Sequence, residues 1–304
     1  MTQGPLDRRA LSEGRGFDLG VCRAMFYLFY AWQCYLYAPS AYVSLPDELW
    51  SPPFLLSSFG APNQVGVIVA TTVFYGFCLA SAVGFMTRFS TAVAALLGGY
   101  LFGVINSYGH IDIHFCPMQM IAFILPFSRA GDHFSLDRLM RGGVRGEGHY
   151  QWTIFLCQLS LVSLMVTAGI QKVLGNWLEQ PGHNMEYWIR YKYFADASVK
   201  GIELPGVLLK LTEYGPLMAG LGVFLLLSEL GSPLALISRW KWARLSVIGS
   251  LFLMQLFLSV ILKTLPSFPW LCAYFFFVPW TKIFRLFRKS EESVMIESSS
   301  KTGV

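Results

Sequence analysis

The stretch "QWTIFLCQLSLVSLMVTAGIQK", from Gln151 to Lys172, decides the fold of this chain. It is long enough to cross a bilayer as one helix, which needs roughly 20 mostly apolar residues. Its only charged side chain is Lys172, at the end. A lysine in that position either extends its ammonium to the membrane surface or sits in a dry pocket because its free amine is needed. Both interpretations start from a membrane helix.

The rest of the chain has the same character. It is 54% hydrophobic and only 13% charged, whereas soluble domains carry about 25% charged residues. A membrane barrel would show short alternating segments instead of long apolar runs. We therefore predict an all-α, polytopic bundle of about eight transmembrane helices. The expected spans are 18–37, 66–86, 90–108, 113–128, 151–172, 214–231, 245–263 and 266–284.

Basic residues in alternate connections predict the orientation. They are Arg8, Arg9, Arg15, Arg88, Arg129, Arg138, Arg141, Arg145, Arg239, Lys241, Arg244, Lys282, Arg285, Arg288 and Lys289. The positive-inside rule places all of them, and both termini, in the cytoplasm. The loop 173–213 is also basic but falls outside. These clusters account for the net charge of +5 without a nucleic-acid partner.

The expected domains follow from the spans. Residues 1–17 form a cytoplasmic segment, 18–287 the transmembrane domain, and 288–304 a disordered, serine-rich cytoplasmic tail. We expect a multi-pass protein of the plasma or inner membrane in a bacterium, or of the endoplasmic reticulum in a eukaryote.

Ionisable residues gather at the outer ends of the fourth and fifth predicted spans. "NSYGHIDIHFCPM", Asn106 to Met118, contains His110, Asp112 and His114. Consecutive helices are usually neighbours, so Lys172 and these groups are expected to share an outward-facing pocket. Two histidines and a carboxylate resemble a metal-binding set. However, Asp112 is two residues from each histidine and points elsewhere on a helix, so we expect no metal.

Two further features are predicted from the same topology. Arg23 in the first span and Glu229 in the sixth both lie near the cytoplasmic side, and we hypothesise a structural ion pair between them. "MEYWIRYKYF", Met185 to Phe194, interleaves aromatic and charged residues. That pattern is typical of a helix lying in the membrane interface, and it would form a lid over the pocket.

These residues also carry a family resemblance. "TAGIQKVLGNWLEQPGHNMEYWIRYKYF" resembles the segment around the active lysine of the vitamin K-dependent gamma-glutamyl carboxylases. The matching positions are Ala168, Gly169, Lys172, Trp177, Gly182, Met185, Glu186, Tyr187, Arg190 and Phe194. "HFCPMQMIAFILPFSRAGDHFSLDRL" is similar to the segment that begins at their functional histidine, here His114, and ends at Ser135 and Asp137. The chain thus resembles the horizontally transferred transmembrane (HTTM) domain family.

The resemblance implies a lyase chemistry. Lys172 would be a base that takes a proton from a reduced quinone similar to vitamin K hydroquinone. Oxygen would then add, and the strong base so formed would deprotonate a glutamate that captures carbon dioxide. Burial would favour the neutral amine. His114 would serve the carboxylation half-reaction, and the implied pocket residues are His110, Asn106, Trp177, Met185 and Tyr187.

The expected partners are the lipid bilayer, a small secreted peptide as substrate, and a separate soluble protein that recognises it. The soluble partner is expected because the carboxylases continue into a large lumenal domain, whereas this chain ends soon after its last span. The alternative is a non-catalytic maturation or export factor for a small peptide, as in sporulation-delaying toxin maturation. Arg23, Glu229, Ser135 and Asp137 are expected to be structural.

Overall fold

The computed structural model describes residues 16–52, 56–58, 60–108, 113–142, 150–200, 206–261 and 269–284. They divide into two compact units. The first comprises the described residues up to 158 and from 270 onward, and the second those between 159 and 269. The described residues are helical and include no strand, apart from an isolated bridge between Trp50 and Tyr108. The all-α fold class is therefore confirmed.

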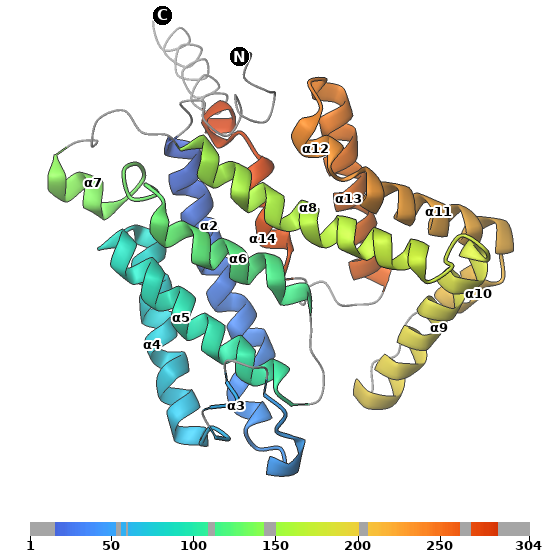
Figure 1. Cartoon of the computed structure of the whole chain (residues 1–304), viewed down its shortest axis with the longest axis horizontal. Coiled ribbons are helices and arrows are strands. Elements are labelled where there is room, and N and C mark those ends of the chain that lie inside the picture. Colours follow the sequence, from blue (N-terminus) through green and yellow to red (C-terminus); the bar gives the residue numbers. More distant parts are fainter. Residues whose placement is uncertain are drawn as a thin grey trace, which may run out of the picture. The chain divides into compact units, whose positions relative to one another are not determined.

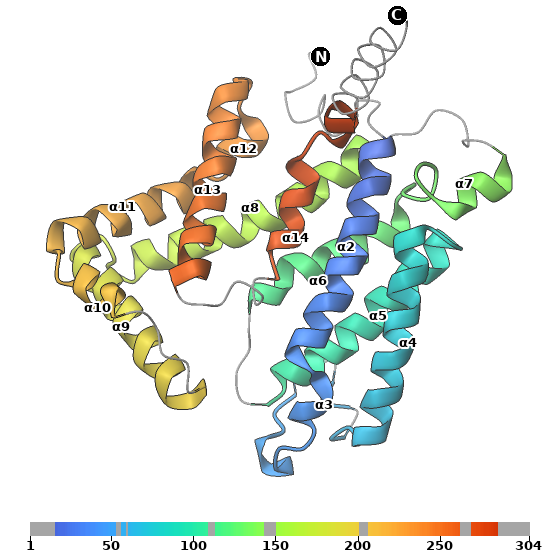
Figure 2. The ribbon, with the colours of Figure 1, turned by 180° about the vertical axis from the view of Figure 1, so that it is seen from behind.

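The first unit is a bundle of four helices around an aromatic core. They are α2 (Gly16–Tyr37), α4 (Gln64–Val83), α5 (Thr87–Asn106) and α6 (Cys116–Ile124), which lie side by side (Figures 1 and 2). Tyr30 of α2 is fully buried and stacks on Phe102 of α5 with ring centroids 5.6 Å apart. Its hydroxyl donates to Gln119 of α6 at 3.0 Å. A buried tyrosine needs such an acceptor, so this contact ties three helices together.

The last described segment returns to the first helix of the same unit. It contains α14 (Leu271–Tyr274) and the short η5 (Phe275–Phe277). Cys22 donates to the carbonyl of Phe275 at 3.1 Å, and Asp18 accepts the Thr281 hydroxyl at 2.6 Å. Part of the predicted span 266–284 is thus packed on α2, while 262–268 lie outside the described residues.

Short elements connect the longer helices of this unit. They are α3 (Pro39–Tyr42), η1 (Asp47–Leu49), η2 (Ile113–Phe115), η3 (Leu125–Phe127) and α7 (Leu136–Arg141). The start of α7 lies beside the connection between α4 and α5, since Asp137 N donates to the carbonyl of Gly84 at 2.9 Å. This arrangement positions the polar groups described below.

The second unit contains the latter part of α8 (Gln151–Leu174) and five further helices. They are α9 (Pro181–Lys200), α10 (Val207–Thr212), α11 (Gly215–Gly231), α12 (Leu234–Ile237) and α13 (Lys241–Ile261). α9 packs along α11 through a buried cluster of Met185, Ile189 and Met218. The predicted lid segment is therefore one part of a longer helix whose apolar face is covered by α11.

Three helices of the described residues are long and apolar enough to cross a membrane. They are α4, α5 and α8, and the stretches 116–127 and 215–231 are shorter apolar helices. Exposed apolar side chains such as Val65, Val69 and Leu79 on α4 are expected on a helix that faces lipid rather than water. Length and composition thus indicate a helical membrane protein.

Candidate functional site

Lys172 and Glu229 form an ion pair that joins α8 to α11. Lys172 Nζ lies 2.6 Å from each carboxylate oxygen of Glu229. The Glu229 side chain is only 6% exposed and the Lys172 side chain 21% exposed. Bonds between charged groups at this distance are among the strongest hydrogen bonds in proteins. The lysine identified from the sequence is therefore the centre of an ordered contact, not a free anchor at a helix end.

Gly169 explains how the two helices approach so closely. It precedes Lys172 by three residues and shares its face of α8. A Cβ at Gly169 would lie 2.9 Å from a methyl carbon of Leu230 and 3.2 Å from Cβ of Glu229. Both distances are shorter than ordinary van der Waals contact between carbons. The glycine of the Ala-Gly-x-x-Lys pattern thus has a structural role, because it leaves space for Glu229, the ion-pair partner of Lys172.

The end of α8 places Trp177 beside the lysine. Asn176 adopts the left-handed region with φ +57°. The amide of Asn176 donates to Val173 O at 3.2 Å, and that of Trp177 to Lys172 O at 2.9 Å. These two bonds form a Schellman cap, in which asparagine is a common substitute for glycine. The chain therefore turns back, and Lys172 Nζ lies 5.8 Å from the centroid of the Trp177 ring.

Trp177 is itself fixed by the second unit, because its indole Nε1 donates to the carbonyl of Gly222 on α11 at 3.3 Å. Lys172 thus has a carboxylate and an aromatic face as neighbours. Since Lys172 Nζ contacts both oxygens of the Glu229 carboxylate, the pair, and not Lys172 alone, is the chemical unit.

Two other predicted pocket residues of this unit are placed differently. Met185 is 2% exposed within the cluster between α9 and α11. Tyr187 is 66% exposed and stacks on Tyr191. Positions two apart on a helix do not share a face, so the two side chains do not line one wall. Among the described residues predicted to line the pocket in this unit, Trp177 is the one that contacts Lys172.

The remaining predicted pocket residues belong to the first unit or are not described. His114 lies in η2, is exposed, and packs edge-on against Trp270 with ring centroids 4.2 Å apart. Asn106 is the last residue of α5 and is half-buried. His110 and Asp112 lie outside the described residues. The expected meeting of His114 with Lys172 therefore stays a prediction.

The hypothesis of an ion pair between Arg23 and Glu229 is wrong. Arg23 is fully buried, and its guanidinium donates to three backbone carbonyls: Ala130 at 2.6 Å, Phe134 at 2.6 Å and Ala82 at 3.3 Å. Glu229 is instead bound by Lys172. The physical reason is that a planar guanidinium with five donors can be satisfied by several carbonyl oxygens and needs no carboxylate.

The expected depths of Lys172 and Glu229 cannot both be right. The predicted topology placed Lys172 at the outer end of the fifth span and Glu229 near the cytoplasmic end of the sixth. Their contact requires both groups to lie at the same depth. A helix of 17 residues such as α11 is about 25 Å long, so the two placements are incompatible. At least one of the two expected placements is therefore wrong.

Ser135 and Asp137 hold the polar loop of the first unit. Ser135 caps the N-terminus of α7 by accepting from Arg138 N at 3.1 Å. The Asp137 carboxylate accepts from Met86 N at 2.8 Å, from Thr87 N at 2.7 Å and from the Thr87 hydroxyl at 2.7 Å. Burial raises the pKa of Asp137. The hydrogen bonds from Thr87 and Met86, together with Arg141, lower the pKa by more than burial raises it, so the net shift is downward.

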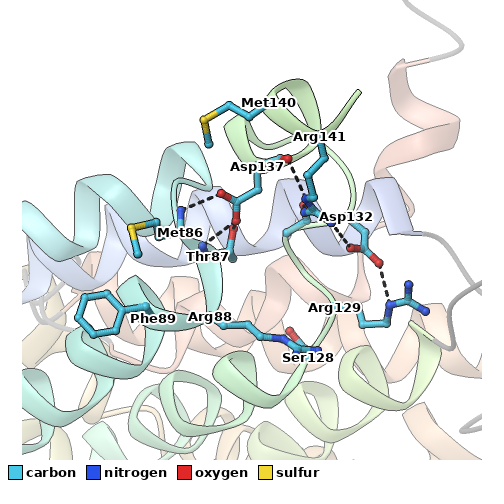
Figure 3. A pocket seen from close by; sticks show the side chains of 11 residues that line it. Met86, Thr87, Arg88, Phe89, Ser128, Arg129, Asp132, Asp137, Met140 and Arg141 are labelled. Atoms are coloured by element: carbon cyan, nitrogen blue, oxygen red, sulfur yellow. Dashed lines mark hydrogen bonds and ion pairs between the residues drawn. The ribbon is translucent and has the colours of Figure 1, made fainter. Parts of the chain in front are cut away.

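A cavity of about 570 Å³ lies beside this loop (Figure 3). It is lined by Met86, Thr87, Arg88, Phe89, Ser128, Arg129, Gly131, Asp132, Asp137, Met140 and Arg141. From the sequence its three arginines were interpreted only as markers of orientation, and the cavity was not predicted. The signal was present, because arginines that follow two different spans on the same side can converge. Their convergence depends on the Gly84 turn and the loop before α7.

The comparisons with known proteins agree with the fold. The family model of the HTTM domain matches residues 16–281. No curated protein and no solved structure matches the chain. The HTTM domain is associated with vitamin K-dependent carboxylase-like membrane proteins. Because the matched region covers nearly all of the described helices, the chain belongs to the HTTM domain family.

Proposed function

We propose that this protein is a membrane enzyme in which the Lys172–Glu229 pair removes a proton from a substrate, in chemistry related to that of the vitamin K-dependent carboxylases. The observation that carries the proposal is the contact of Lys172 Nζ with both oxygens of a buried carboxylate. The lysine keeps 21% of its side chain exposed. One partner is thus accessible while the other is shielded, as a proton-accepting pair requires.

The proton balance of the pair is simple. Proton transfer from the lysine ammonium to the Glu229 carboxylate gives a neutral amine and a neutral acid. A low-dielectric site reduces the cost of this step, because it penalises two buried charges. The amine then accepts one proton from the substrate, which leaves as an anion, and the pair gains one positive charge. Glu229 holds the first proton throughout.

A reduced quinone is the proposed co-substrate. Its hydroxyl group is a weak acid that a neutral lysine can deprotonate, and the aromatic face of Trp177 beside Lys172 suits a flat ring. The quinone supplies the reducing power for the reaction with oxygen, with carbon dioxide as a further co-substrate if the protein carboxylates. We further propose that a small secreted peptide is modified, with a separate soluble protein to recognise it, and that His114 assists the carboxylation half-reaction.

We also propose a multi-pass topology with both termini in the cytoplasm. The loop arginines support this orientation through the positive-inside rule. Of the eight predicted crossings, the sixth requires revision, because Glu229 shares the level of Lys172. We place the pair at the outer part of the membrane, where α8 ends. The host membrane is that of the bacterial cell surface or the eukaryotic endoplasmic reticulum.

The alternative function is a non-catalytic maturation or export factor for a small peptide. One observation favours it: an ion pair that joins two helices and is covered by Trp177 can also serve only to stabilise the packing of those helices. In that case the charges matter only for holding α8 to α11. An apolar pair of similar volume should then serve as well, because buried ion pairs can be replaced in this way without loss of stability.

The decisive assay measures quinone epoxide formed by the full chain in lipid nanodiscs with a reduced quinone and oxygen. Lys172→Met should abolish turnover. Glu229→Gln should lower turnover, because the amide cannot take the lysine proton. Lys210→Met and Glu179→Gln are matched controls, because both residues are exposed in the same unit, and they should leave turnover unchanged. A wild-type protein without turnover for any quinol would remove the support for this function.

The double variant Lys172→Met/Glu229→Leu separates the two candidates. It replaces the ion pair by an apolar contact and should keep the fold in either case. If the pair is catalytic, the double variant is folded and inactive. If the double variant instead supports full peptide maturation in cells, the ion pair has only a structural role and the enzyme proposal fails.

A further inference from the structure

The cavity of the first unit has an excess of positive charge. Asp132 accepts from Arg129 Nε at 2.8 Å and lies 3.5 Å from Arg141 Nη1. It also accepts from the Tyr150 hydroxyl at 3.3 Å. Asp137 is committed to the N-terminus of α5 through Thr87. Both carboxylates that line the cavity are thus already engaged by groups of the protein.

Arg88 is the third arginine of the cavity, and it is exposed. Within the part of the chain that the structure describes, no acceptor lies in hydrogen-bond reach of its guanidinium. Figure 3 shows Arg88 with Phe89, on the opposite side of the cavity from Asp137 and Arg141. The guanidinium fork is suited to phosphate oxygens. The polar cavity therefore offers one unpaired cation and space for an anion.

An apolar groove adjoins the polar cavity. It has a volume of about 380 Å³ and is lined by Val73, Gly76, Phe77, Ala80, Phe85, Met86, Phe89 and Ser90. Met86 and Phe89 line both spaces, so the groove begins where the polar cavity ends. Its walls come from α4 and α5, two helices that are long and apolar enough to span a membrane. The groove therefore runs from the α4–α5 connection along the apolar faces of these two helices.

We propose that these two spaces bind one anionic phospholipid of the bilayer. The phosphate lies in the polar cavity against Arg88, and an acyl chain lies in the groove between α4 and α5. Charge complementarity supports the anionic headgroup, because each basic residue near the surface favours anionic lipid. The apolar groove supports a ligand with a chain rather than a free phosphate. Neither Lys172 nor Glu229 is among the residues that line the two spaces.

The test is native mass spectrometry of the purified full chain in detergent. The probes are dioleoylphosphatidylglycerol, dioleoylphosphatidylcholine, and glycerol 1-phosphate as a headgroup without chains. We expect phosphatidylglycerol to bind about fivefold more tightly than phosphatidylcholine, the size expected for one arginine. Arg88→Gln should remove this preference. Arg138→Gln is the matched control, because it lies on α7, is exposed, and does not line the cavity.

Gly76 allows an independent test of the chain-binding groove. A Cβ at this position meets no atom within 4 Å, so Gly76→Leu should fill the groove without disturbing the fold. It should weaken binding of phosphatidylglycerol by several-fold. Gly220→Leu, at another open glycine outside the groove, is the control. Thermal unfolding of each variant confirms that it is folded.

Three results would overturn the proposal. One is equal binding of the two lipids by the wild type. Another is an unchanged preference in Arg88→Gln. The third is glycerol 1-phosphate competing as well as phosphatidylglycerol while Gly76→Leu has no effect, which would identify a site for a soluble anion instead.

Discussion

Lys172 Nζ lies 2.6 Å from both carboxylate oxygens of Glu229, a residue 57 positions further along the chain. The contact joins the last turn of α8 to the end of α11, and Gly169 makes the close approach possible. Since the chain turns back and places Trp177 beside the lysine, three residues of the family resemblance, Gly169, Lys172 and Trp177, lie around this contact. The pair should therefore influence stability as well as chemistry.

Glu229→Ala should destabilise the protein by about 2 kcal/mol. Loss of one partner leaves a charge uncompensated, which costs about 3–5 kcal/mol for fully buried pairs, but partial exposure of Lys172 screens it. Unfolding in SDS, followed by tryptophan fluorescence, measures the change. Glu179→Ala, at an exposed position, should change the free energy of unfolding by less than about 0.5 kcal/mol. Equal effects of the two variants would mean that the ion pair contributes no stability.

Gly84→Ala should be more destabilising than Gly142→Ala. Both glycines have positive φ, +74° and +71°, so alanine at either position costs about 1–2 kcal/mol. Only at Gly84 does the new Cβ overlap Ser135 and lie 2.8–2.9 Å from the Arg23 guanidinium, whereas at Gly142 it meets nothing within 4 Å. The overlap should add about 1–3 kcal/mol. Thermal unfolding of the two variants provides the comparison, and equal losses would show that the Arg23 contact adapts freely.

Asp137→Asn should destabilise the protein at neutral pH and much less in acid. Asp137 caps α5, a contribution of about 1 kcal/mol, and its pKa is lowered in the folded protein. A lowered pKa gives stability that is complete above the unfolded-state value, near 4, and is lost as pH falls through the folded-state value. Thermal unfolding of wild type and variant between about pH 3 and pH 7 should therefore converge at the acidic end. A constant difference across this range would contradict the charged cap.

Val173→Cys and Leu230→Cys should react at the same rate with a membrane-impermeant maleimide added from one side. Both residues adjoin the ion pair and are about 40% exposed. The original topology, with Lys172 and Glu229 near opposite faces, predicts labelling from opposite sides. A Cys116→Ser background is suitable, because Cys116 is the exposed one of the six free cysteines. Labelling from opposite sides would contradict the paired arrangement.

His114→Ala should separate the two half-reactions if the protein is a carboxylase. The family resemblance assigns His114 to carboxylation and Lys172 to the quinol step. Loss of a general acid or base costs roughly 10²–10⁴-fold in rate, so product carboxylation should fall by at least about 100-fold while quinone epoxide still forms. His183→Ala, at an exposed position outside the proposed site, is the control. Parallel loss of both products would place His114 in the quinol step or in folding.

Much of the fold could be predicted from the sequence because it depends on local properties. Long apolar runs specify membrane helices without reference to the rest of the chain, and α4, α5 and α8 occupy three of the predicted spans. Lys172 could be singled out for the same reason, since a lone charge in an apolar run is conspicuous. The resemblance around Ala168 and Met185 predicted the HTTM family, which the match over 16–281 confirms.

The partners of these residues were decided only by the tertiary structure. Glu229 was assigned to Arg23 and to the opposite membrane face, because charge and span order say nothing about which helix ends meet. The Arg23 guanidinium donates to carbonyls of a loop more than 100 residues away. Every residue has a backbone carbonyl, so the sequence does not indicate which carbonyls accept these hydrogen bonds. The cavity beside Arg88 likewise exists only because the Gly84 turn and the loop before α7 are packed together. Apolar periodicity is encoded residue by residue, whereas contacts between distant side chains depend on how the helices pack.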